Sequence, residues 1–94
     1  MNTEEIRNTI QSEIEIYTRL AKEHRVAWYQ KQEAGLEDFD YRMSEEFKGS
    51  AYTLAHLMEK LGFLEPEQER QLCKLIANVV IVDSNGEYLT SPKV

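Results

Sequence analysis

Hydrophobic residues recur with helical spacing along the first third of the chain. Between residues 3 and 34 they return every three or four positions, so that on a helix of about 100° per residue they fall on one side. This stripe consists of Ile6, Ile10, Ile14, Tyr17, Leu20, Ala21, His24 and Trp28. Asn2 with Glu5 three residues later has the form of a capping box. We therefore expect a helix over 3–34 that ends at Gly35, a residue suited to the position after a helix end.

A second helical pattern covers residues 40–61. It lies between a cap at Asp38 or Asp40 and a glycine stop at Gly62. Its apolar stripe consists of Met43, Phe47, Ala51, Leu54, Leu57, Met58 and Leu61. Because the connection to the first helix is short, the two helices are expected to be antiparallel neighbours.

The register of this hairpin follows from where the chain turns. A turn near residue 37 would set Trp28 beside Phe47 and Tyr17 beside Met58. The bulky side chains of the first helix would then face the small residues 49–51, as in interdigitating layers.

The third pattern begins at Pro66, which suits the first turn of a helix. Its apolar positions are Leu72, Leu75, Ile76, Val79 and Val80. Four consecutive β-branched residues at 79–82, followed by Asn85-Gly86, are also typical of a β-hairpin. We favour a helix over 66–81 and an irregular tail over 83–94, with a small hairpin as the alternative. The predicted fold class is all-α: an antiparallel hairpin of two long helices plus a shorter third helix, in one domain over 1–82.

Composition narrows the classes of function. The 94 residues carry a formal net charge of −6, which disfavours a general nucleic-acid binder because that class needs a dominant positive field. Cys73 is the single cysteine, so an intramolecular disulfide is impossible. The polar, acidic N-terminus differs from a signal peptide, and the longest apolar run, at 79–82, is too short for a membrane span. We expect a cytoplasmic protein without a membrane contact.

The sequence offers little for catalysis. His56 and Glu59 have helical ligand spacing but occur once and on the predicted outer face, so neither a metal nor a cofactor is expected. His24 lies within the apolar stripe, which favours a hydrogen-bonded core histidine over a general base. Cys73 is interpreted as a packing residue. We do not expect an enzyme.

Two surfaces remain as candidate binding sites. One is a basic strip with apolar members on the outer side of the first helix, formed by Arg19, Lys22, Arg25, Val26 and Tyr29. The other is the aromatic hairpin tip, where Phe39 and Tyr41 could anchor a partner because aromatic residues dominate interface hot spots. Five carboxylates frame this tip and could imitate nucleic acid: Glu37, Asp38, Asp40, Glu45 and Glu46.

The favoured function is a non-catalytic protein-binding module, for example a regulator or inhibitor of a larger protein. It would act as a homodimer, because three helices of this length leave apolar surface in the seam between the first two helices. The alternative is a sensor or scavenger of an anionic metabolite or nucleotide. In that case Lys22 and Arg25 would meet the anion and Tyr29 would stack on it.

Overall fold

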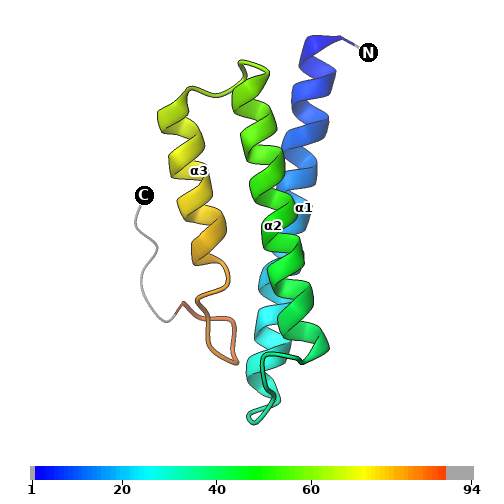
Figure 1. The fold of residues 1–94 in the computed structure, drawn as a ribbon, viewed down its shortest axis with the longest axis vertical. Helices are drawn as coiled ribbons and strands as arrows, with labels where there is room; N and C mark the ends of the chain where they lie inside the picture. The colour runs from blue at the N-terminus through cyan, green and yellow to red at the C-terminus, as the bar shows by residue number, and fades with distance from the viewer. Residues whose placement is uncertain (1, 89–94) are drawn as a thin grey trace.

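The computed structural model describes residues 2–88 of the chain, and these form three helices. They are α1 (Thr3–Gln30), α2 (Phe39–Lys60) and α3 (Pro66–Asn78). α1 and α2 form a long antiparallel hairpin, and the shorter α3 runs back beside α2 (Figure 1). The predicted all-α fold is confirmed.

The first helix begins as expected and ends early. The Asn2 side chain accepts a hydrogen bond from the backbone N–H of Glu5 at 2.8 Å, as a cap does. The helix ends at Gln30, four residues before the predicted end, and the residue that adopts a positive φ is Gln32 (62°) and not Gly35. The Trp28 indole N–H donates to the carbonyl of Gly35 at 3.0 Å. This hydrogen bond joins the end of α1 to the connection over residues 31–38 that leads to α2.

Both ends of α2 and the start of α3 follow the sequence signals. Asp38 caps α2 by accepting from the N–H of Asp40 at 2.8 Å. At its far end, Gly62 has φ 81°, and the N–H of Phe63 reaches back to the carbonyl of Met58 at 2.9 Å, which is a Schellman motif. Pro66 opens α3.

The end of α3 corrects a prediction. The helix stops at Asn78, three residues before the expected 81. Val80 and Val82 then turn inward, and Val82 is fully buried. A turn held by the Asp83 carboxylate follows, and one isolated antiparallel bridge joins Val82 to Tyr88. Over the described residues this is neither a longer helix nor a full hairpin, because packing of the β-branched side chains overrides helix propensity. The rest of the predicted tail, 89–94, lies outside the described residues.

The core joins all three helices. Its buried members are Ile10, Ile14, Ala51, Ala55, Met58 and Ile76. No helix in the described part of the chain has the length and apolarity to span a membrane.

The hairpin register differs from the prediction. Phe47 stacks on Tyr17 and His24, with ring centroids 5.8 and 5.6 Å apart, and Trp28 instead contacts Tyr41 at 5.0 Å. The predicted register is wrong because α1 ends four residues early and the chain turns nearer residue 34. The space beside Gly49 is also open, so bulky side chains do not fill it.

Candidate functional site

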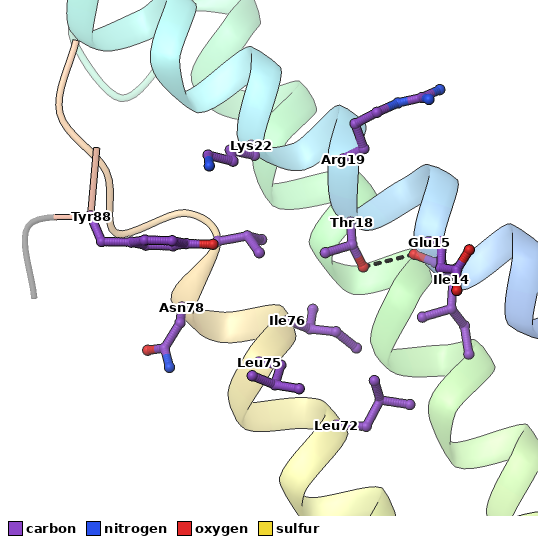
Figure 2. Close-up of a pocket in the computed structure, with 11 residues that line it drawn as sticks. Ile14, Glu15, Thr18, Arg19, Lys22, Leu72, Leu75, Ile76, Asn78 and Tyr88 are labelled. Carbon is purple, nitrogen blue, oxygen red and sulfur yellow. Dashed lines mark hydrogen bonds between the residues drawn. The ribbon is translucent and has the colours of Figure 1, made fainter. Parts of the chain in front are cut away.

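An apolar groove of about 490 Å³ runs between α1 and α3 (Figure 2). It exists because α3 packs chiefly against α2 and leaves the neighbouring flank of α1 uncovered. We call this feature the α1–α3 groove; its principal lining residues are Ile14, Thr18, Arg19, Lys22, Leu72, Leu75, Ile76, Val79 and Tyr88. The Thr18 hydroxyl donates to the carbonyl of Ile14 at 2.7 Å, so this polar atom is already satisfied.

Two cations of the predicted strip stand at the edge of this groove. Arg19 is well exposed and forms a loose ion pair with Glu23, at 3.8 Å. The Lys22 ammonium lies over the ring of Tyr88, 4.7 Å from its centroid. Both side chains carry positive charge beside an apolar surface.

Arg25 does not belong to this surface. The residue is 7% exposed and turns toward α2, where its Nε donates to the Ser44 hydroxyl at 2.9 Å. One terminal nitrogen lies 3.3 Å from the Glu45 carboxylate, without hydrogen-bond geometry, and the guanidinium stacks over Tyr41 at 4.4 Å. The prediction that Arg25 meets an external anion is wrong, because its position between α1 and α2 provides these internal partners.

The apolar members of the strip are also partly covered. Val26 and Tyr29 are half-buried. A Cβ at Gly86 would lie only 3.7 Å from Val26, and the Gln30 amide donates to the carbonyl of Ser84 at 2.9 Å. The turn after α3 therefore lies against the strip, which is not one continuous exposed face. Covering Val26 removes apolar surface from water.

At the hairpin tip the two predicted aromatics differ. Phe39 is 58% exposed, and Leu36 beside it in the loop is 65% exposed. Tyr41 is half-buried against Trp28 and Arg25, so it is a packing residue. The exposed apolar pair at the tip is Phe39 and Leu36.

Most carboxylates at the tip are paired within the chain. Lys31 bridges Asp38 and Asp40 at 2.9 and 2.7 Å, and His24 contacts Asp40 at 2.7 Å. The hydrogen bond from Lys31 lowers the pKa of both carboxyl groups, and the same bonds raise the pKa of Lys31. With Glu45 also paired to Lys48, this arrangement gives little support to an imitation of nucleic acid.

The hydrogen-bonded histidine expected at position 24 has Asp40 as its partner, at 2.7 Å. The sequence did not predict the groove, because the apolar pattern of the third helix places Leu72 and Leu75 in one stripe without showing which neighbour covers each of them. The length of the third helix could have predicted the groove, because a helix half as long as α1 cannot cover both helices of the hairpin. No protein-family model, curated protein or solved structure matches the chain.

Proposed function

We propose that the chain is a non-catalytic protein-binding module whose α1–α3 groove receives an amphipathic helix from a partner protein. The observation that carries the proposal is an open apolar groove between two helices with cations at one edge. A partner helix laid into such a groove buries anchors at i, i+3 or i+4, and i+7. Acting as a regulator or inhibitor, the module would mask that helix in a larger protein.

The exposure of the groove supports this occupant. Leu75 is 39% exposed although it belongs to the apolar stripe of α3, and Val79 one turn later is half-buried. Burying such side chains under a partner contributes favourably to the free energy of binding, by about 25 cal/mol for each Å² of apolar surface removed from water. Isolated apolar residues on a surface need no explanation, whereas several around one hollow indicate a contact.

The charges at the edge of the groove favour an acidic partner. Arg19 and Lys22 lie on successive turns of α1, and among residues 2–88 the groove is lined by a single acidic residue, Glu15. A helix with acidic residues beside its apolar face would complement these cations, which accelerates association and fixes orientation more than it adds affinity.

A photo-crosslinking amino acid at position 75 tests whether the α1–α3 groove binds a partner helix. Position 16 supplies a matched control, because Ile16 is also 39% exposed and does not line the groove. In the native host, we expect position 75 to capture one protein through an acidic amphipathic helix, and position 16 to capture none. Equal capture at both positions would refute the groove as the site. Capture of a second copy of this chain would instead make the groove the interface of the predicted homodimer.

A second candidate function is binding of an anionic amphiphile of small-molecule size. The volume of about 490 Å³ falls within the range of ligand pockets, and Lys22 could meet an acidic head group. A thermal-shift screen with fatty acids and nucleotides tests this alternative. A bound ligand would raise the melting temperature by mass action, and Lys22→Glu would remove the increase. Without any increase, this candidate fails.

A further inference from the structure

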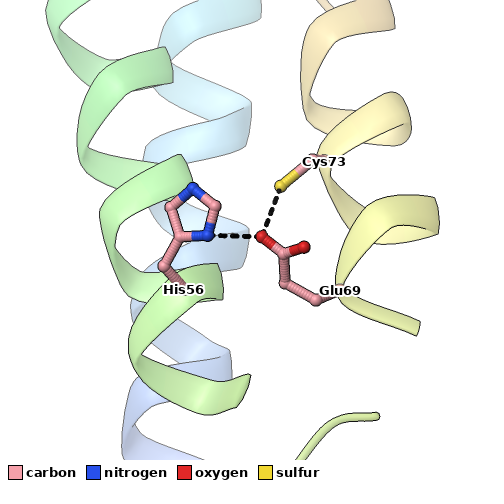
Figure 3. Close-up of side chains that lie close together, drawn as sticks. All are labelled: His56, Glu69 and Cys73. Carbon is pink, nitrogen blue, oxygen red and sulfur yellow. Dashed lines mark hydrogen bonds and ion pairs between the residues drawn. The ribbon is translucent and has the colours of Figure 1, made fainter. Parts of the chain in front are cut away.

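Three side chains with metal-binding atoms meet between α2 and α3 (Figure 3). Glu69 and Cys73 come from successive turns of α3, and His56 reaches across from α2. The Glu69 carboxylate oxygen Oε1 lies 2.5 Å from His56 Nδ1 and 3.4 Å from Cys73 Sγ. The three donor atoms lie within 4.8 Å of one another.

Packing fixes two of these side chains and leaves the third adjustable. Cys73 packs against the core, and the Glu69 side chain is only 12% exposed. The His56 side chain is 63% exposed, so its ring can rotate without disturbing the core. The arrangement was not predicted, because the sequence analysis paired His56 with Glu59 on its own helix.

We propose that His56, Glu69 and Cys73 form a binding site for a divalent transition-metal ion, with zinc as the best fit. Imidazole nitrogen, carboxylate oxygen and thiolate sulfur are the three ligand types of protein zinc sites. Solvent would supply the fourth ligand of a tetrahedral ion. By joining one residue of α2 to two of α3, the ion would hold these helices together.

The distances suit this geometry after a small movement. Zinc bonds of about 2.0–2.3 Å set neighbouring ligand atoms roughly 3.5 Å apart. The pair formed by His56 and Glu69 must open by about 1 Å. The His56 side chain is 63% exposed, which leaves it free to make this movement. One carboxylate oxygen of Glu69 already lies beside both neighbours, because it accepts from the Cys73 thiol and lies close to the His56 ring.

The charges also balance. A neutral His56, the Glu69 carboxylate and the Cys73 thiolate carry two negative charges, which equal the charge of the ion. On binding, the thiol loses its proton to solvent and the sulfur takes its place on the metal. No electron is transferred.

The neighbouring residues limit the affinity. Arg70 and Lys74 line the same hollow. The Arg70 guanidinium is occupied by the exposed carboxylate of Glu67, 3.1 Å from its Nε. With these cations nearby and only three protein ligands, we expect weaker binding than at a closed structural zinc site.

The experiment uses the untagged full chain after removal of metal by a chelator. Calorimetric titration with zinc chloride should give one ion per chain, and cobalt(II) should give the near-ultraviolet charge-transfer band of a thiolate complex. Cys73→Ser should abolish that band, and His56→Ala and Glu69→Gln should each weaken zinc binding at least about tenfold. Glu67→Gln is the matched control, an exposed carboxylate of the same helix, and should bind like the parent chain.

Several outcomes would overturn the proposal. These are the absence of stoichiometric zinc binding, unchanged binding after His56→Ala, and one zinc shared by two chains through Cys73. The His56→Ala variant keeps the test valid even where Cys73→Ser fails to fold, because the His56 side chain is mostly exposed.

Discussion

The guanidinium of Arg25 is held between the two long helices by three different contacts. It donates to Ser44, lies against the carboxylate of Glu45 and stacks on Tyr41. A charged group is tolerated in such a buried position only where partners replace the lost water. Arg25 is therefore a structural residue that fixes how α1 and α2 approach each other.

Replacing this residue should destabilise the fold. Arg25→Ala removes the packed side chain and leaves the Ser44 hydroxyl without its donor, so we expect the free energy of unfolding to fall by about 2–3 kcal/mol. Arg19→Ala, which removes an exposed arginine of the same helix, should change it by less than about 0.5 kcal/mol. Urea denaturation followed by circular dichroism measures both. If both variants lost the same free energy of unfolding, the buried contacts of Arg25 would not contribute to stability.

The network of Lys31, Asp38, Asp40 and His24 gives the hairpin turn a pH dependence. The hydrogen bond from Lys31 lowers the pKa of Asp40 below its ordinary value of 3.8, so the folded state binds this proton less readily than the unfolded state. The contribution to stability is therefore present above pH about 4 and is lost as the pH falls through the lowered folded-state pKa. Asp40→Asn should make the loss of stability below pH 4 less steep. Urea midpoints at a series of pH values measure the slope, and Glu46→Gln, on the exposed face of the same helix, is the control. If the stability of Asp40→Asn fell with pH as steeply as that of the parent chain, Asp40 would not be the source of this pH dependence.

At the scale of the elements, the helix ends are set in two ways. α2 ends in a Schellman motif with Gly62 at positive φ. This kind of helix end can be predicted from the local sequence, because it depends on a glycine at one position. α1 ends without a glycine in this position, and contacts of Trp28 and Lys31 with the loop hold the turn. Local sequence is a reliable guide only to the first kind of ending.

Two alanine substitutions with opposite expected signs test this difference. Gly62→Ala should lower the free energy of unfolding by about 1–2 kcal/mol, because φ is 81° and an L-residue is strained there. Gly49→Ala, within α2, should raise it by up to about 1 kcal/mol through helix propensity. The space around both positions is open, so neither effect includes a clash. Thermal and urea unfolding of the two variants measures them, and a stabilising Gly62→Ala would contradict the interpretation of the helix end.

At the scale of the whole molecule, α3 covers one half of the hairpin and the segment after it covers part of the other half (Figure 1). Val82 is fully buried, and the following turn contacts α1 through Ser84, Gly86 and Tyr88. This segment completes the core and also forms one end of the α1–α3 groove.

Neighbouring residues in this segment should therefore contribute differently to the free energy of unfolding. Val82→Ala removes two fully buried methyl groups and should cost about 1.5–3 kcal/mol of unfolding free energy. Ile81→Ala, at a position that is 37% exposed, should cost less than about 1 kcal/mol. Urea denaturation distinguishes the two, and equal losses would mean that the segment is not anchored as described.

Much of the fold could be predicted from the sequence. The apolar period placed Ile10, Ile14 and Ala21 on the buried side of α1, and the caps at Asn2 and Asp38 are where the sequence indicated. These are local properties, because a period of 3.6 residues and a capping side chain act within a few positions. The binding surface was predicted less well. Arg19 and Lys22 do line the groove, while Arg25 turned inward.

The sequence by itself determined the helical class, the antiparallel hairpin and the starts of all three helices, since each depends on neighbours in the chain. Only the tertiary structure decided the hairpin register, the burial of Arg25, the groove between α1 and α3, and the meeting of His56 with Glu69 and Cys73. The physical reason is that the flank of a helix has no fixed environment of its own. Whether it meets water, another helix or a returning segment depends on how distant parts of the chain pack.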